Sequence, residues 1–354
     1  MSRYSAITGW GMSVPEKVLT NDDLAQMVDT TDEWITSRTG IKERHIIGPD
    51  ESASTLSIAA ARQALERAGI TGADLDLIIV ATICGDYRFP STANLVQAAL
   101  GAQCAAFDVQ AACSGFLYAL ATGHQFVANG ASKRVLVVGV EVISTIVDYT
   151  DRATCVLFGD GAGAVILEPS DEPGGVLGYT MGSDGSRPDL LWIPAGGSAE
   201  PITEEAVRER RHLVQMNGNE VFKFATRIMG TAMEEALHNA GMSAGDMDLF
   251  IPHQANLRII DSASKRLGLP PEKVFINIEK YGNTSAAAIP IAMCEAIDQG
   301  RIKPGSHIGM VAFGGGLTWA AAVVKWTAPV RTREQQNAET PQAADATREH
   351  AEVR

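Results

Sequence analysis

Two stretches of the chain, "ALERAGITGADLDLII" (residues 64–79) and "ALHNAGMSAGDMDLFI" (residues 236–251), share the frame ALxxAGxxxxDxDLxI. Each reads as the end of a helix, a turn at glycine and a buried strand. A match of this length at an offset of 172 residues indicates an internal duplication. The sequence therefore predicts two similar halves, residues 1–170 and 171–330, followed by a tail at residues 331–354.

A second correspondence lies downstream, where "ANGASKRVLVVGVE" and "DQGRIKPGSHIGMVAF" both end a helix at glycine and enter a strand. The two glycines, Gly130 and Gly300, are 170 positions apart. The same offset leads from Cys113 to Asn283. We therefore expect Cys113 and Asn283 at equivalent helix starts that face each other across a pseudo-twofold axis.

Composition favours a globular α/β protein. The chain has 354 residues, 45% of them hydrophobic, and 34 glycines, and short β-rich runs alternate with longer runs rich in Ala, Leu and Gly. This alternation predicts a largely parallel sheet. No apolar run is long enough to cross a bilayer and the first residues lack a signal pattern, so we expect a cytoplasmic protein.

Cysteine usage and charge exclude several classes of function. The five cysteines are widely spaced and contain no CxxC pair, which indicates free thiols rather than disulfides or a zinc site, and we expect neither metal nor cofactor. The formal charge of -13 and pI near 5.0 argue against general binding to nucleic acid or to an anionic membrane. The last 24 residues contain a single valine and no other large apolar residue, so a disordered tail is predicted for 331–354.

Three polar residues share one local context. Cys113, His253 and Asn283 each follow a strand-like run and stand just before a segment with helical spacing. In open α/β sheets, ligands bind at the carboxyl ends of strands, and a helix N-terminus favours the reactive thiolate of a cysteine. The alternatives are a small buried hydrophobe for Cys113, a hydrogen-bonded core histidine for His253 and an ordinary turn residue for Asn283. Small neighbours in "QAACSG" favour close approach of a substrate to Cys113.

A run of glycines, "FGGGLTW" (residues 313–319), separates two strand-like stretches. It is either a flexible turn or a place where a backbone N–H approaches a reacting carbonyl, since only glycine lets the main chain come so close.

Together, Cys113, "HQAN" (253–256), "GNTSAA" (282–287) and "FGGGLTW" resemble the thiolase-fold condensing enzymes, most closely the β-ketoacyl-acyl-carrier-protein synthase III family. The likeness extends over nearly all of the chain except the tail. It is carried further by the stretches "GWGMSVPEKVLTNDDL", "TDEWITSRTGIKERH", "RFPSTANLVQAALG", "TDRATCVLFGDGAGA" and "GNEVFKFA". The resemblance implies a thiolase-like α/β fold of two pseudo-duplicated halves in five layers, αβαβα.

The resemblance also implies a catalytic set. Cys113 would accept the acyl group, His253 and Asn283 would promote decarboxylation, and the backbone N–H groups of Cys113 and Gly315 would hold the oxyanion. The implied reaction is the decarboxylative condensation of a short acyl-CoA primer, such as acetyl-CoA, with malonyl-acyl carrier protein. This reaction initiates type II fatty-acid synthesis.

Further contacts follow from the same resemblance. Trp34 would stack on the adenine of CoA, and Arg38 and Arg152 would face its nucleotide and phosphates. Lys223 and Arg258 would meet the acidic carrier protein, since a basic rim on an acidic protein steers an anionic partner. The plain alternative for each of these charges is a solvated surface.

For the acyl pocket, the resemblance implies a homodimer in which Phe89 closes the pocket from across the interface. The other pocket residues implied are Ile143, Phe158, Leu191 and Phe313.

Two alternatives to fatty-acid initiation stay open. The first is a starter-unit condensing enzyme of a specialised polyketide or lipid pathway that uses another acyl-CoA. Two features leave this alternative open: the tail, and Ser114 at a position where the family often has alanine. The second is a non-catalytic subunit of the same fold, against which an intact Cys-His-Asn set argues. Plant-type polyketide synthases share that set but differ from this chain in the C-terminal glycine loop.

Overall fold

The computed structural model describes residues 4–329, and the predicted tail at residues 331–354 lies outside the described residues. Nine strands form a sheet in the order β11-β12-β13-β8-β1-β7-β6-β4-β5. In chain order, the first five strands of this sheet are β1 (Tyr4–Ser13), β4 (Leu77–Ala81), β5 (Ala105–Val109), β6 (Val135–Val142) and β7 (Asp160–Ser170). The other four are β8 (Gly175–Ser183), β11 (Leu249–Pro252), β12 (His307–Gly314) and β13 (Thr318–Lys325).

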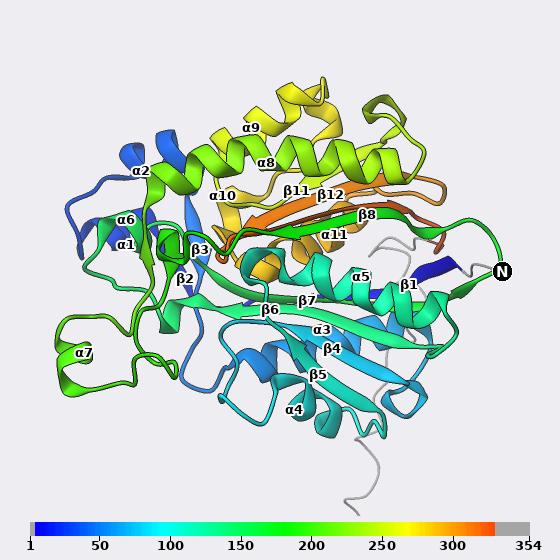
Figure 1. The fold of residues 1–354 in the computed structure, drawn as a ribbon, viewed down its shortest axis with the longest axis horizontal. Coiled ribbons are helices and arrows are strands. Elements are labelled where there is room, and N and C mark those ends of the chain that lie inside the picture. The colour runs from blue at the N-terminus through cyan, green and yellow to red at the C-terminus, as the bar shows by residue number, and fades with distance from the viewer. Residues whose placement is uncertain (1–3, 330–354) are drawn as a thin grey trace, which may run out of the picture.

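These two sets of strands form two wings that lie in separate layers, as Figure 1 shows. They join where β1 and β8 pair at Ser5 and Gly175. Gly175 has a φ of 67°, and a Cβ there would lie 1.5 Å from the Ser5 carbonyl oxygen, so the junction requires glycine.

Helices fill the space between the wings and cover both outer faces (Figure 1). The inner layer is α5 (Gly115–Ala128) and α11 (Ala288–Asp298), and the outer layers are α3 (Ala53–Ala68) with α4 (Thr92–Ala99) and α8 (Gly218–Asn239) with α9 (Leu257–Arg266). Because α5 and α11 have a sheet on either side, they are apolar around most of their circumference, as their sequences "GFLYALA" and "AIPIAMC" show. The result is the five-layered αβαβα arrangement that the resemblance implies.

The remaining elements are short. They are β2 (Val18–Thr20), β3 (Glu43–His45), β9 (Leu191–Trp192), β10 (Gln215–Met216), α1 (Asn21–Ala25), α2 (Asp32–Thr39), α6 (Arg152–Cys155), α7 (Glu204–Arg208) and α10 (Ile278–Tyr281). Among residues 4–329, no helix combines the length and apolarity that crossing a membrane requires.

The prediction of a largely parallel sheet is wrong. Strand β4 pairs in parallel with β5 and β6, β11 with β12, and β1 with β8 at a single residue pair, but the longer ladders β1–β7, β6–β7, β12–β13 and β8–β13 are antiparallel. The physical reason is the length of the connections. Strands β12 and β13 follow each other through the tight turn of the glycine run, and so short a link cannot make the crossover that parallel strands need.

The repeated sequence frame has a repeated structure. Both of its helices end at a left-handed glycine, Gly69 and Gly241, each with a φ of 69°. A polar cap follows in each half, in which Asp74 accepts from Thr71 and Asp246 accepts from Ser243. The predicted boundary near residue 170 falls at the end of β7, and the division into 1–170 and 171–330 stays a prediction.

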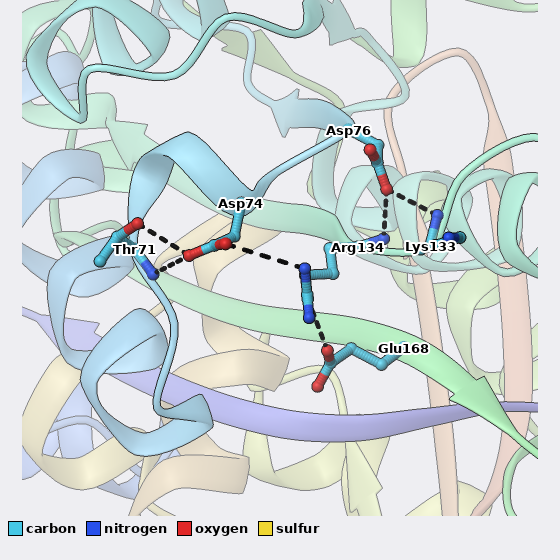
Figure 2. A network of polar contacts seen from close by, with 6 residues as sticks. All are labelled: Thr71, Asp74, Asp76, Lys133, Arg134 and Glu168. Atoms are coloured by element: carbon cyan, nitrogen blue, oxygen red, sulfur yellow. Dashed lines mark hydrogen bonds and ion pairs between the residues drawn. The ribbon is translucent and has the colours of Figure 1, made fainter.

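The second aspartate of the frame links each strand to its neighbour. Figure 2 shows Asp76 accepting the backbone N–H groups of Lys133 (2.7 Å) and Arg134 (2.9 Å). Asp248 accepts the N–H of His307 (2.8 Å) in the same way. In the first half only, the Arg134 side chain also pairs with Glu168 at 2.9 Å (Figure 2). The DxD of the frame therefore ties β4 to β6 and β11 to β12.

The predicted equivalence of Cys113 and Asn283 is off by three residues. Helix α5 has 14 residues and α11 has 11, so the offset measured at the glycines that end these helices does not apply where they begin. The two helices start at Gly115 and Ala288, which places Cys113 opposite Ala286 instead. Asn283 lies just before the 3-10 turn Ser285–Ala287 that leads into α11.

Candidate active site

Cys113 lies in a single 3-10 turn, Ala112–Ser114, between β5 and α5. The turn is tight, since Ala112 has a φ of 46°, and Gly115 packs where a Cβ would be 3.1 Å from Ala81. Cys113 itself is buried. Burial raises the pKa of the Cys113 thiol to about 12, while a hydrogen bond from the Ser285 side chain lowers it. The resting sulfur is therefore a neutral thiol whose activation depends on nearby donors.

Two cavities meet at Cys113. The larger, of about 410 Å³, has mainly apolar walls, and the smaller, of about 90 Å³, also contains His253 and Asn283. Cys113 lines both. The three side chains of the predicted catalytic set thus border the smaller cavity, and of these three only Cys113 also borders the larger one.

His253 directly follows β11, where its backbone N–H donates to the Val311 carbonyl at 2.8 Å. Its ring is buried, packs edge-to-face on Phe313 with centroids 5.8 Å apart, and neither ring nitrogen has a partner among the described residues. Burial lowers the pKa of His253 to about 3. The ring is therefore neutral and offers one unused N–H to a ligand in the smaller cavity.

Asn283 is held by both its backbone and its side chain. Its N–H donates to the Leu157 carbonyl at 2.8 Å, and its own carbonyl accepts from Gly159 at 3.1 Å. Its side-chain Oδ1 accepts the backbone N–H of Ser285 at 2.9 Å. Because the oxygen of the amide is occupied, the orientation of the side chain is fixed and the Nδ2 donor remains for a ligand.

The glycine run lies against the nucleophile. A Cβ on Gly314 would be 2.6 Å from the Cys113 backbone nitrogen, and one on Gly315 would be 2.9 Å from the Leu191 carbonyl oxygen. Gly314 lines the smaller cavity and Gly315 the larger. The run makes the β12–β13 turn and packs against the backbone of Cys113, and a role of its N–H groups toward a reacting carbonyl stays a prediction.

The predicted CoA contacts cluster together. The guanidinium groups of Arg38 and Arg152 lie 4.5 Å and 4.9 Å from the centre of the Trp34 ring. Asn256, which lines the smaller cavity, donates to the Arg38 carbonyl at 3.0 Å. This cluster therefore lies next to the smaller cavity.

The two predicted carrier contacts lie on the outer helices α8 and α9. Lys223 is exposed and pairs with Glu220 at 2.7 Å. Arg258 lies 5.2 Å from the ring of Phe222 and lines a surface hollow that also includes Lys265. Phe222 borders both this hollow and the smaller cavity, so Arg258 is close to an opening of the site.

Of the predicted pocket residues, Ile143 lines the larger cavity only, whereas Phe158 and Leu191 line both cavities. Phe313 does not line the larger one: it lines the smaller cavity beside His253. Alternate residues of a strand point to opposite faces, and on β12 this places Phe313 on the same side as Val311, toward the outer helices. Phe89 lines neither cavity and is 86% exposed, on a loop after β4.

Sequence reasoning missed two buried polar residues beside Cys113, namely Glu141 and Ser285. The signal for Glu141 was available, because it is the only charged residue in the strand "VLVVGVEV". Ser285 lies in the recognised "GNTSAA" stretch but gave no signal of its own.

The five-layered fold and the Cys-His-Asn site define a condensing enzyme of the thiolase class. Family models described as "3-Oxoacyl-[acyl-carrier-protein (ACP)] synthase III" and its "C terminal" match residues 107–185 and 237–326. The chain is 56% identical over 322 residues to the β-ketoacyl-[acyl-carrier-protein] synthase III of Desulfitobacterium hafniense (strain DSM 10664 / DCB-2), covering 91% of this chain and 97% of that one.

Solved structures agree. The 3-oxoacyl-[acyl-carrier-protein] synthase III of Aquifex aeolicus VF5 superposes with a TM-score of 0.84 at 47% identity, over 91% of this chain and all of that one. The priming β-ketosynthase of the R1128 polyketide pathway gives 0.86 at 36% identity, over 93% and 98%. The chain belongs to the β-ketoacyl-[acyl-carrier-protein] synthase III family.

Proposed function

We propose that this chain catalyses the decarboxylative condensation of a short acyl-CoA primer, acetyl-CoA, with malonyl-acyl carrier protein. The product is a 3-oxoacyl-acyl carrier protein, and the reaction initiates type II fatty-acid synthesis. The observation that carries this proposal is the position of Cys113 between two cavities, with His253 and Asn283 on one side only. One side can hold an acyl group while the other receives the second substrate.

In the first half-reaction, Cys113 sulfur attacks the thioester carbonyl of the acyl-CoA. The tetrahedral oxyanion is held by the N–H groups of Cys113 and Gly315. The C–S bond to CoA then breaks, the acyl group stays on Cys113, and the thiol proton leaves with CoA as its free thiol. The absence of a Cβ atom at Gly314 lets this run pack against the backbone of Cys113, and this close approach supports the role.

In the second half-reaction, the malonyl thioester occupies the smaller cavity. Its terminal C–C bond breaks, CO₂ leaves, and the electron pair becomes an enolate whose oxygen accepts from His253 Nε2–H and Asn283 Nδ2–H. The enolate carbon attacks the acyl carbonyl on Cys113, and the sulfur leaves and is reprotonated. Both donors are neutral, because the pKa of His253 is lowered to about 3 by burial and an amide does not titrate.

Substrate contacts follow the positions of the basic residues. Trp34, Arg38 and Arg152 bind the adenine nucleotide of CoA beside the smaller cavity. Lys223 and Arg258 receive the acidic carrier protein. On a chain of net charge -13, such a local basic rim steers an anionic partner to the entrance, and the association rate falls as salt rises.

The primer occupies the larger cavity, lined by Ile143, Phe158 and Leu191. The exposure of Phe89 supports a homodimer in which this ring closes the pocket of the partner subunit. A bulky phenyl ring there favours short primers such as acetyl. The protein acts in the cytoplasm in this scheme.

The test is mass spectrometry after mixing the protein with acetyl-CoA, with Cys113→Ala as the control. An acetyl adduct on Cys113 that disappears when malonyl-acyl carrier protein is added, with 3-oxobutyryl-carrier as product, is the expected result. No adduct on Cys113 would contradict the proposal and would favour a non-catalytic subunit.

A second candidate is the priming of a specialised polyketide or lipid pathway with another acyl-CoA. The fold likeness to the R1128 priming ketosynthase favours it. A panel of acyl-CoA primers separates the two: acetyl-CoA is the best primer for fatty-acid initiation, whereas a clear preference for a longer or branched acyl group supports the second candidate.

A further inference from the structure

The carboxyl of Glu141 is a buried ionisable group beside the site that the mechanism above does not use. Glu141 is the penultimate residue of the apolar strand β6, is 0% exposed, and is hydrogen-bonded to Ile83, Thr82 and Ser285. Glu141 forms no salt bridge among residues 4–329, and the leading influences on its pKa are burial and hydrogen bonds. A buried carboxylate without a cation is strongly disfavoured. Burial accordingly raises the pKa of Glu141 to about 8, which keeps it largely protonated at neutral pH.

The hydrogen bonds of Glu141 divide between its two oxygens. Oε2 accepts from the Ile83 N–H at 3.1 Å and from the Thr82 hydroxyl at 3.3 Å. Oε1 lies 3.2 Å from the Ser285 hydroxyl, with a weaker contact to Ile83 at 3.3 Å. Oε2 thus fits the carbonyl oxygen of a neutral carboxyl, and Oε1 fits its O–H group.

The titratable groups that face Glu141 come from three elements. Cys84, after β4, is a hydrogen-bond partner, Cys113 comes from the turn before α5, and Asp160 of β7 acts on Cys84. Burial raises the pKa of the Cys84 and Asp160 side chains as well, so Cys84 is a neutral thiol.

Ser285 connects Glu141 to both reacting side chains. Its side chain is buried and lines the larger cavity together with Cys113, and hydrogen bonding by Ser285 lowers the pKa of the Cys113 thiol. Its backbone N–H holds Asn283 Oδ1 at 2.9 Å. The backbone of Ser285 therefore orients the enolate donor, and its hydroxyl acts on the nucleophile.

Proton counting makes the charge of Glu141 decisive. A serine hydroxyl has one proton to donate. If Glu141 is ionised, that proton goes to the carboxylate and none is left for the sulfur. If Glu141 is neutral, its own O–H donates to Ser285 Oγ, and the Ser285 proton is free for the Cys113 thiolate. An ionised Glu141 also raises the pKa of Cys113 through direct repulsion.

We propose that Glu141 is a positioning residue for the nucleophile: as a neutral carboxyl it donates to Ser285, and this directs the Ser285 hydroxyl to the Cys113 thiolate. This inference rests on the proposed function in that it assigns Cys113 as the nucleophile. When the thiolate forms, Glu141 and Ser285 keep their protons. Only the thiol proton of Cys113 is lost, and it leaves with CoA.

The test is the rate of Cys113 alkylation by iodoacetamide as a function of pH, followed on the Cys113 peptide by mass spectrometry. Ser285→Ala removes the donor to the thiolate and is expected to slow alkylation on the order of tenfold at pH 7. Glu141→Leu is expected to slow it similarly. Glu141→Gln keeps an N–H for Ser285 Oγ and an oxygen for Ile83 at every pH, so its alkylation matches the native rate at pH 7 and exceeds it above pH 8.

A double variant and a matched control make the test specific. In the Ser285→Ala background, Glu141→Leu is expected to have no further effect, because Glu141 acts through that hydroxyl. Asp160→Asn is the control, because Asp160 is also buried and has a raised pKa. Its side chain accepts hydrogen bonds from Ser144 and Ile47 among residues 4–329, and not from Ser285. The Asp160→Asn variant should therefore leave the pH profile of Cys113 alkylation unchanged. Melting temperatures identify any variant whose fold is damaged.

Two results would overturn the proposal. One is a Glu141→Gln protein, folded by its melting temperature, that alkylates as slowly as Glu141→Leu. The other is a Glu141→Leu effect that persists undiminished without the Ser285 hydroxyl. Alkylation needs neither acyl-CoA nor carrier protein, so this outcome is independent of whether acetyl-CoA acylates native Cys113, which tests the proposed function.

Discussion

Replacing Asn283 with aspartate should separate the two half-reactions. In the native site, Oδ1 is held by the Ser285 N–H and Nδ2 is left to donate to the enolate. Aspartate keeps the accepting oxygen but puts a second acceptor where the donor was. Loss of one such donor lowers the rate by about 10²–10³. If the new carboxyl is charged, repulsion of the enolate at about 4 Å adds about 4 kcal/mol at an effective dielectric of 20, or roughly another 10³.

The pH dependence of this variant carries a second expectation. Residue 283 is buried, and burial raises the pKa of an aspartate, so the variant regains an O–H donor as pH falls through that raised pKa. The ratio of variant to native decarboxylation should therefore rise from pH 8 to pH 5. Asn283→Ala, which cannot regain a donor, serves as the matched control and should show a constant ratio.

The assay has two readouts, CO₂ release from malonyl-acyl carrier protein and acetylation of Cys113 by acetyl-CoA. We expect Asn283→Asp to lose the first by at least about 10³-fold at pH 8 while keeping the second. Undiminished decarboxylation would refute the role of Nδ2. An equal loss of both activities would show instead that the turn around Cys113 had been disturbed.

Four further predictions follow from the geometry. Burial lowers the pKa of His253 from 6.5 to about 3, so between these pH values the unfolded state binds a proton that the folded state does not. The free energy of unfolding should therefore fall by up to about 1.4 kcal/mol per pH unit as pH drops from 6.5 toward 3. His253→Gln should remove this contribution to the pH dependence, as measured by urea unfolding at several pH values. Gly314→Ala, whose Cβ would be 2.6 Å from the Cys113 nitrogen, should slow Cys113 acetylation on the order of 10²-fold in stopped-flow assays, with melting temperature as the check on folding. Trp34→Ala should raise the KM for acetyl-CoA about tenfold through lost stacking, and an unchanged KM would place adenine elsewhere. Arg258→Glu should raise the KM for malonyl-acyl carrier protein and flatten its salt dependence without changing acetylation by acetyl-CoA.

The layout of the fold was largely predictable because its strongest signal is local and occurs twice. The frame ALxxAGxxxxDxDLxI contains a helix, its glycine end and a buried strand, and each of these features depends on neighbouring residues. Strand direction was not predictable in the same way, because it depends on how far the chain travels before it returns. A hairpin such as that between β12 and β13 depends on the conformation of three consecutive glycines.

The site was predictable in its reacting groups and less so in their surroundings. Cys113, His253 and Asn283 lie in recognisable stretches and do border one cavity. The supporting contacts join residues far apart in the chain, such as Glu141 and Ser285, and a register inferred from helix ends missed the three-residue difference between α5 and α11. Tertiary packing fixes such details, and a single sequence does not display it.

The placement of one sulfur on the wall of two chambers bears on how such an enzyme diversifies. Substitutions around the larger chamber at Ile143, which does not line the smaller cavity, can change which primer is accepted without altering the contacts of His253 or Asn283. Selection on starter choice is thereby uncoupled from selection on carbon–carbon bond formation. A lineage can explore new primers while its chemistry stays intact.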